Sequence, residues 1–374
     1  MIPYRPDRVL VEQRAWEDTI THEILSRLPD VRVESMADME DALKNPHAGA
    51  ALGASDKETL ILARNRGTFL KKCPGAGAEV CCGYHVLNFA FNCHFECSYC
   101  VLQTYLNNPA LIVCTNTGDM IAEVREKLAL QPRRTFRIGT GEMADSLALD
   151  DITRHSRILV PAFAGLPNGV LELKTKSDRV ENLEGLDHRG RTVVSWSVNT
   201  PAVIDSDELK TAGLPERLSA ARRCQSWGYR IGFHFDPLIH YQGWEHDYEE
   251  TVREVFRSVD HGSIAWVSLG TLRFTPHLRD TLKRRCPASR IPFGEFVPGH
   301  HGKLRYFRPI REEMYSRMAE WIRRYAPGVF VYLCMESRLV WQRSFGYSPA
   351  GTARLSDQLD ARALPSCDIR GSCP

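Results

Sequence analysis

Six strand-like runs alternate with helical segments from residue 83 onward, and this alternation restricts the fold more than any other feature of the chain. The runs are 83–91, 134–138, 169–175, 192–198, 229–235 and 263–269. Alternating strands and helices imply parallel strands joined by right-handed crossovers. The pattern allows a doubly wound sheet or an incomplete barrel, and in either one the ligand site lies at the carboxyl ends of the strands.

The two ends of the chain lack this alternation. Residues 1–82 read as a small α/β lead-in, with helical spacing over 20–28. Residues 286–374 are expected to form an accessory region that covers the substrate and carries a helix over 310–326. We therefore predict an N-terminal α/β region, a core of six β/α units over 83–285, and a C-terminal region.

Composition narrows the function classes. The 48 basic and 46 acidic side chains nearly cancel, so contact with nucleic acid is expected only in a local groove. The N-terminus starts no signal peptide and no apolar run is as long as a membrane span, which predicts a cytoplasmic protein without a membrane partner. In that reducing compartment, twelve cysteines indicate metal binding or thiol chemistry rather than disulfides.

Three cysteines follow the first strand of the core in a C-x3-C-x2-C pattern, namely Cys93, Cys97 and Cys100. Thiolates at such short spacing converge on one soft metal centre, either iron–sulfur or zinc. A structural zinc needs a fourth close ligand, and His94 is badly placed because it adjoins Cys93. Three ligands on a cluster of four irons leave one iron open to a substrate or cofactor.

This motif, with the aromatic Tyr99 before its last cysteine, resembles the signature of the radical S-adenosylmethionine (SAM) superfamily. The resemblance implies a [4Fe–4S] cluster on the three cysteines and SAM chelated at the open iron. It also implies that the cluster cleaves SAM to a 5′-deoxyadenosyl radical, which abstracts hydrogen from the substrate. The six units match the partial (β/α)6 barrel of that superfamily. A flavodoxin or ferredoxin is the kind of electron donor that this chemistry implies.

The second strand ends in a segment that resembles the superfamily's Gly-Gly-Glu contact with the SAM amino group. The segment comprises Gly139, Thr140, Gly141 and Glu142. Glycines let a ligand approach the backbone closely, and a carboxylate suits an ammonium group. An ordinary turn is the alternative.

Nearly the whole chain resembles the spore photoproduct lyase family. The matching stretches are 8–15, 97–104, 197–199, 232–240, 243–245 and 272–275. The resemblance adds Lys176, Ser197 and Asn199 to Tyr99 and the glycine segment as SAM contacts, the alternative being a solvated lysine and two strand-end polar groups. Because the family repairs a methylene-bridged thymine dimer in DNA, the resemblance implies radical repair or modification of a nucleic-acid base.

Two positions depart from the family pattern. The family's relay tyrosine after the cluster motif is Val101 in this chain. The family's hydrogen-donating cysteine should lie near Gly141 or Glu142, yet no cysteine occurs between Cys114 and Cys224. The termination step of the family therefore cannot run in the same way.

Other cysteines could compensate. Cys334 becomes a candidate hydrogen donor if the C-terminal region folds over the barrel mouth; the alternative is a buried cysteine that packs as a small apolar residue. A second cluster or a zinc site could form from Cys73, Cys81, Cys82, Cys367 and Cys373. We expect structural roles for Cys114, Cys224 and Cys286.

A basic segment over 284–311 is the candidate contact with DNA or another nucleic acid, because basic residues beside aromatic ones suit phosphates and bases. It contains Arg284, Arg285, Arg290, Lys303, Arg305, Arg308 and Arg311, interleaved with His300, His301, Tyr306 and Phe307. A solvated basic surface is the alternative. Two other functions stay open at this point: radical modification of a small metabolite or peptide, and a metal-stabilised binding protein without catalysis.

Overall fold

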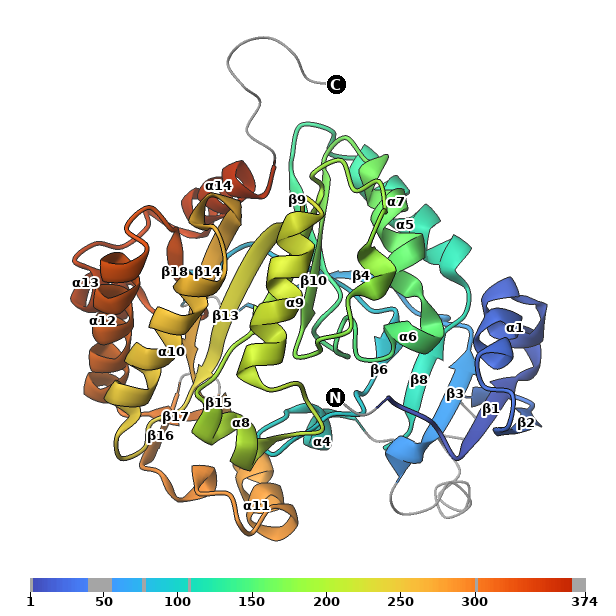
Figure 1. The fold of residues 1–374 in the computed structure, drawn as a ribbon, viewed down its shortest axis with the longest axis horizontal. Coiled ribbons are helices and arrows are strands. Elements are labelled where there is room, and N and C mark those ends of the chain that lie inside the picture. Colours follow the sequence, from blue (N-terminus) through green and yellow to red (C-terminus); the bar gives the residue numbers. More distant parts are fainter. Residues whose placement is uncertain (1–2, 40–55, 76–78, 107–108, 300–301, 365–374) are drawn as a thin grey trace.

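The central sheet has eight strands in the order β18-β14-β13-β11-β10-β9-β5-β4. Its strands are β4 (Leu70–Lys72), β5 (His85–Leu87), β9 (Phe136–Gly139), β10 (Gly169–Thr175), β11 (Thr192–Ser197), β13 (Arg230–Leu238), β14 (Ile264–Thr271) and β18 (Val331–Leu333). Neighbours from β5 to β18 are parallel, while β4 pairs antiparallel with β5. In this computed structural model, which describes residues 3–39, 56–75, 79–106, 109–299 and 302–364, the sheet curls into a half-barrel (Figure 1).

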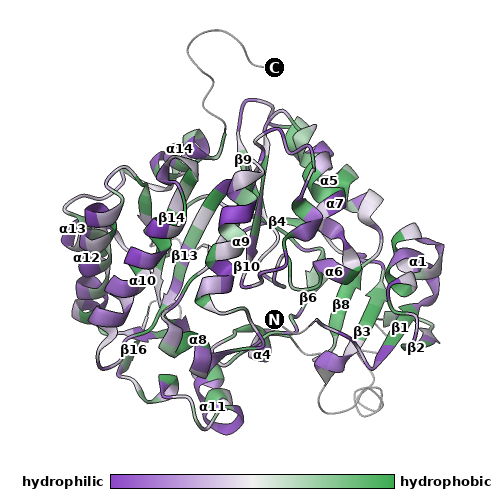
Figure 2. Ribbon diagram, viewed as in Figure 1, coloured by the Kyte–Doolittle hydropathy of each residue, from purple (hydrophilic) through white to green (hydrophobic). Residues whose placement is uncertain are grey.

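The central strands of the half-barrel are mostly apolar, which suits strands covered on both faces. Every residue of β11 and β14 is buried, which is typical of strands with both faces shielded from water. The helices are α1 (Thr19–Ser26), α4 (Leu102–Tyr105), α5 (Thr117–Ala129), α6 (Asp150–Thr153), α7 (His155–Ala164), α8 (Pro201–Asp207), α9 (Leu214–Ser226), α10 (Trp244–Ser258), α11 (Pro276–Arg285), α12 (Arg308–Tyr325), α13 (Arg338–Phe345) and α14 (Thr352–Ala363). Figure 2 shows hydrophilic residues along the outer helices α10, α12 and α13. Among the described residues, no helix is both long enough and apolar enough to span a bilayer.

A second sheet of five strands lies beside the half-barrel, in the order β2-β1-β3-β8-β6. Its strands are β1 (Arg8–Glu12), β2 (Arg32–Met36), β3 (Thr59–Ala63), β6 (Ala90–Phe91) and β8 (Leu111–Cys114). The single strand predicted over 83–91 is therefore two strands: β5 joins the half-barrel, and β6 turns away to pair antiparallel with β8. This division places the end of β6, and the cysteine motif that follows it, between the two sheets.

The predicted partial barrel is confirmed, with one addition. All six predicted runs contribute strands to it, and the C-terminal region adds β18 as a seventh parallel strand beside β14. A strand of only three residues leaves little alternation to detect, which explains why the sequence pattern fades there. Sheet pairing crosses the predicted region boundaries at residues 82 and 285, so the division into three regions stays a prediction.

Candidate active site

The three motif cysteines lie on one short loop at the carboxyl end of the half-barrel. Cys93 follows β6, Cys97 ends the two-residue strand β7 (Glu96–Cys97), and Cys100 precedes α4. The Cys100 N–H donates to the Cys97 carbonyl over 3.1 Å. The Gln103 side-chain amide also donates to that carbonyl, over 3.0 Å. These bonds tighten the turn that carries Cys97 and Cys100.

The loop is attached to the segment that follows β11. Strand β7 pairs antiparallel with β12 (Glu208–Leu209), with Cys97 opposite Glu208. The Ser98 N–H donates to the Asp207 carbonyl over 2.8 Å, and the Ser98 hydroxyl donates to the Asp207 carboxylate. The Ser289 hydroxyl donates to the same carboxylate over 2.5 Å. The cysteine loop is therefore fixed to α8 and β12, which follow the barrel strand β11, by both backbone and side chains.

A buried charge network lies directly beneath the loop. Arg217 of α9 contacts Glu208 over 2.6 Å, with both side chains at most 1% exposed. The Tyr99 hydroxyl donates to the other oxygen of Glu208, and the Lys176 Nζ lies 5.9 Å from the Tyr99 ring centre. Burial lowers the pKa of Lys176, but Glu208 and the Cys97 thiol outweigh it and raise that pKa above its ordinary value. Two predicted SAM contacts, Tyr99 and Lys176, thus share one anionic partner.

The thiols suit a cationic metal centre. Burial raises the pKa of Cys97 to about 12 and that of Cys93 further, so a bare thiolate is disfavoured at both positions unless a cation offsets its charge. Three soft sulfur donors on one loop fit an iron–sulfur cluster with one open iron. Within the described residues, no three His, Cys, Asp or Glu side chains are grouped in a way that could hold a single metal ion.

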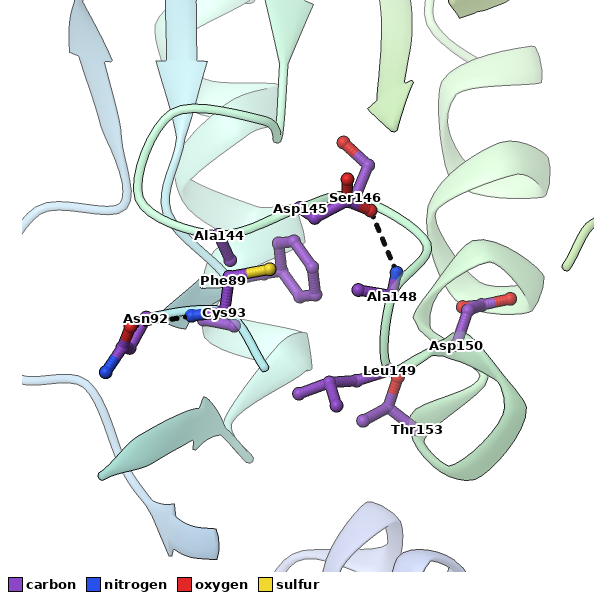
Figure 3. A pocket seen from close by; sticks show the side chains of 11 residues that line it. Phe89, Asn92, Cys93, Ala144, Asp145, Ser146, Ala148, Leu149, Asp150 and Thr153 are labelled. Carbon is purple, nitrogen blue, oxygen red and sulfur yellow. Dashed lines mark hydrogen bonds between the residues drawn. The ribbon is translucent and has the colours of Figure 1, made fainter. Parts of the chain in front are cut away.

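A small cavity of about 10 Å³ adjoins Cys93, and Figure 3 shows Phe89 and the loop after β9 facing it. Asp145 of that loop accepts hydrogen bonds from the Ala148 N–H over 2.9 Å and the Thr175 hydroxyl over 2.6 Å. Its second oxygen accepts from the Lys176 N–H over 2.8 Å. Asp145, which the motif search missed, therefore joins the ends of β9 and β10.

The glycines of the predicted SAM segment accommodate the protein's own side chains. A Cβ atom at Gly139 would overlap the Tyr84 hydroxyl, and one at Gly141 would lie 3.0 Å from the Lys174 carbonyl. Tyr84 thus occupies the space where a side chain at Gly139 would stand, and the role of Gly139 in SAM binding stays a prediction. Glu142 is exposed at the end of the segment, so its role in SAM binding stays a prediction.

Of the two predicted contacts near the carboxyl end of β11, Ser197 is its last residue and Asn199 lies two residues beyond it. The Ser197 carbonyl accepts from Arg217 over 2.9 Å. The Asn199 amide is 1% exposed and used within the protein: its nitrogen donates to the Pro237 carbonyl over 3.0 Å, and its oxygen accepts from Tyr248 over 2.6 Å. Asn199 thus fixes the strand ends, and any contact with SAM would be in addition to these bonds.

Glu172 on β10 is a further buried carboxylate that sequence reasoning missed. It accepts hydrogen bonds from His234 over 2.8 Å and from the Ser195 hydroxyl. Burial alone would raise the pKa of Glu172, but His234 and the hydrogen bonds lower it to about 2. The sequence signal is the position of Glu172 inside a strand that is otherwise apolar up to Lys174 and Thr175 at its end.

Cys334 follows β18 and faces charged groups rather than an apolar core. Arg273 donates to its sulfur over 3.6 Å and also contacts Asp236 over 3.4 Å. Burial raises the pKa of Cys334 to about 12, so the thiol keeps its proton at neutral pH. The C-terminal region therefore brings this thiol to the barrel mouth, and its catalytic role stays a prediction.

The basic segment divides into structural and exposed residues. Arg305 and Arg311 contact the buried Glu336 over 3.0 and 2.9 Å, and the Tyr306 hydroxyl accepts from the His240 N–H over 3.0 Å. These three predicted nucleic-acid contacts instead hold the fold together. The exposed predicted residues are Arg284, Arg285, Arg290, Arg308 and Phe307, whereas His300 and His301 lie outside the described residues.

The other cysteines are separate from the motif loop. Cys114 and Cys224 are buried, and Cys286 is partly exposed. Cys73, Cys81 and Cys82 are partly exposed, while Cys367 and Cys373 lie outside the described residues. A second metal site on these cysteines stays untested.

Comparisons with known proteins agree on one family. The family model "Spore photoproduct lyase" matches residues 4–332. The spore photoproduct lyase of Geobacillus sp. (strain Y412MC61) is 26% identical over 256 residues, covering 66% of this chain and 75% of that protein. The Bacillus subtilis (strain 168) lyase is 23% identical over 330 residues, covering 85% and 94%.

Solved structures show the same fold. Spore photoproduct lyase complexed with dinucleoside spore photoproduct matches with a TM-score of 0.78 and 23% identity, covering 89% of this chain and 100% of that one. A variant of that lyase with bound AdoMet and dinucleoside spore photoproduct matches with the same figures.

Proposed function

The chain belongs to the spore photoproduct lyase family, and from that premise we propose that it repairs a lesion in DNA, with dinucleoside spore photoproduct as the first substrate to test. It is a radical SAM enzyme that uses a [4Fe–4S] cluster and SAM. The resemblance identified in the sequence is thereby confirmed. Nothing supports the two alternatives, modification of a small metabolite or peptide and a binding protein without catalysis.

The observation that carries the proposal is the cysteine loop fixed to α8 and β12, which follow β11. Cys93, Cys97 and Cys100 would hold three irons of the cluster, at the end of the barrel where ligands bind in such folds. When bound, the cluster and SAM supply a 5′-deoxyadenosyl radical that removes a hydrogen atom from the substrate. The protein's part is to position these groups and exclude water.

The residues around the loop are suited to hold SAM by charge. The Glu142 carboxylate can accept hydrogen bonds from the ammonium group, and the Lys176 ammonium can donate to the carboxylate. Tyr99, kept in place by Glu208, offers a ring face beside Lys176. The full proposed set is Tyr99, Gly139, Gly141, Glu142, Lys176, Ser197 and Asn199.

The DNA contact is proposed for the exposed part of the basic segment. Arg284 and Arg285 end helix α11, and Arg290 follows in the next loop. Lys283 of the same helix lies 5.7 Å from the ring centre of the exposed Phe293. Exposed arginines suit phosphates, and an exposed ring with an ammonium group beside it suits an unstacked base.

Cys334 is proposed as a hydrogen donor because it is protonated and lies among the charged groups at the barrel mouth. Val101 is 45% exposed and carries no phenol, so the family's relay is absent at that position. Electrons would come from a flavodoxin or ferredoxin in the cytoplasm, where we place the enzyme.

The test is anaerobic reconstitution of the full chain with iron, sulfide, dithionite and SAM, followed by addition of dinucleoside spore photoproduct. We expect 5′-deoxyadenosine together with the repaired dinucleoside. The control is the triple variant Cys93→Ala, Cys97→Ala, Cys100→Ala, which should bind no cluster. Repair at the same level in that variant, or no 5′-deoxyadenosine above background in the wild type, would contradict the proposal.

A further inference from the structure

The two edges of the half-barrel are joined by the segment between β4 and β5. Its Val80 forms an isolated antiparallel bridge with Glu336, just beyond β18, through an N–H···O bond of 2.9 Å. Arg305 then contacts both Glu79 and Glu336 over 3.0 Å, and all three side chains are at most 12% exposed. Because β4 and β18 are the outermost strands, this junction closes the open side of the barrel at its mouth.

This junction gathers thiols that come from opposite edges of the sheet. Cys334 lies two residues before Glu336, and Cys81 follows Val80. The Cys81 sulfur lies 2.7 Å from where a Cβ atom at Gly75 would stand. Gly75 in turn donates its N–H to the Cys73 carbonyl over 2.7 Å. The four cysteines gathered at this junction are Cys73, Cys81, Cys82 and Cys334.

Cys73 and Cys334 face the same polar groups in the barrel mouth. Both thiols lie within electrostatic reach of Arg273 and Lys174, and Cys73 is also within reach of Glu142. Glu142 adjoins the position where the family resemblance places the donor cysteine that this chain lacks. The two thiols therefore border the space in which a donor is required.

Cys73 and Cys334 differ from Cys81 in whether the thiol keeps its proton. Burial raises the pKa of Cys73 to about 11, as it raises that of Cys334, so both keep the hydrogen atom that a donor must give. A hydrogen bond from Cys82 lowers the pKa of Cys81 below its usual value, which favours its thiolate. A thiolate has no S–H hydrogen to transfer, so Cys81 is not suited to this step.

Resting on the proposed function, we propose that Cys73 is a hydrogen-atom donor that shares the barrel mouth with Cys334. The S–H bond of one thiol breaks homolytically, and its hydrogen joins the carbon-centred substrate radical as a new C–H bond. A sulfur-centred radical remains on that cysteine. The other thiol can pass its hydrogen atom to this radical without net oxidation. The last sulfur radical then takes one electron from the one-electron reductant of the reaction and one proton from water.

The first test needs no turnover. The full chain, without SAM or reductant, is alkylated with iodoacetamide in the presence and absence of dinucleoside spore photoproduct, and each cysteine is followed by peptide mass spectrometry. We expect the substrate to slow alkylation of Cys73 and Cys334 several-fold and to leave that of Cys224, which is buried in α9, unchanged. Substrate binding that leaves the Cys73 rate unchanged would overturn the proposal.

The second test compares Cys73→Ala, Cys334→Ala and the double variant, with Cys224→Ala as a control that removes a thiol buried in α9. Each single variant should still complete repair with a several-fold rise in by-products, and the double variant should form 5′-deoxyadenosine without clean product. Clean repair by Cys73→Ala, together with a double variant no worse than Cys334→Ala, would remove Cys73 from the mechanism. If Cys73 is removed in this way, formation of 5′-deoxyadenosine by the wild type would still support the proposed function.

Discussion

The buried pair Glu208–Arg217 gives the sharpest test of how the cysteine loop is held. Glu208→Gln removes the charge that Arg217, Lys176 and the Tyr99 hydroxyl share, while it keeps the shape of the side chain. Since the partners are at most 1% exposed, water cannot replace the lost charge. Removing one member of a buried ion pair costs about 3 to 5 kcal/mol, a large part of the stability of an ordinary protein.

Urea unfolding of the metal-free protein, followed by tryptophan fluorescence, measures this loss. Glu249→Gln is the matched control, because it breaks a surface pair with Arg324 whose side chains are 51% and 31% exposed. A pair of that kind contributes about 0 to 1 kcal/mol. Adding Arg217→Met to Glu208→Gln should recover part of the loss, because the buried guanidinium that lost its partner is then removed as well. Equal losses for Glu208→Gln and Glu249→Gln would refute the reasoning.

Three further predictions concern other parts of the molecule. Gly139→Ala should lower the free energy of unfolding by about 1 to 3 kcal/mol, because its methyl group would overlap the Tyr84 hydroxyl; an unchanged urea midpoint would contradict this. Arg285→Ala should reduce the salt dependence of DNA binding by about 0.9 in log–log slope, measured by mobility shift at graded salt. Arg311→Ala should instead lower the free energy of unfolding. A reduced salt slope for Arg311→Ala, without one for Arg285→Ala, would reverse the roles assigned to these two residues. Glu172 has a pKa lowered from 4.5 to about 2, so its stabilising effect is present above pH 4.5 and lost as pH falls toward 2. Glu172→Gln should therefore flatten the acid side of the stability profile measured by thermal unfolding, and parallel profiles would argue against this role.

The sequence predicts those parts of the molecule whose signal is local. The alternation of apolar strands and helices is sufficient for the half-barrel, and the spacing of Cys93, Cys97 and Cys100 is sufficient for the loop. Strand β18 is missed because its three residues carry almost no pattern and its place depends on pairing with β14. Glu208 and Arg217 are missed because charged residues near helix ends are usually solvated. Only tertiary packing makes them a buried pair.

The basic segment is a second case in which the sequence alone does not predict the role of charged residues. Composition alone groups Arg305 and Arg311 with Arg284 and Arg285, since all four carry the same charge. The structure separates them because Glu336, distant in sequence, neutralises the first two. Charge in a sequence therefore indicates a nucleic-acid surface only after buried acidic partners have been found.

The late position of β18 in the chain has a consequence for synthesis. During translation the edge of β14 has no partner until residues beyond 333 have left the ribosome, because β18 is the strand that covers it. An unpaired parallel edge of buried, apolar residues invites pairing between nascent chains. A truncated product that stops after α11 would thus present this edge permanently, and we expect it to aggregate.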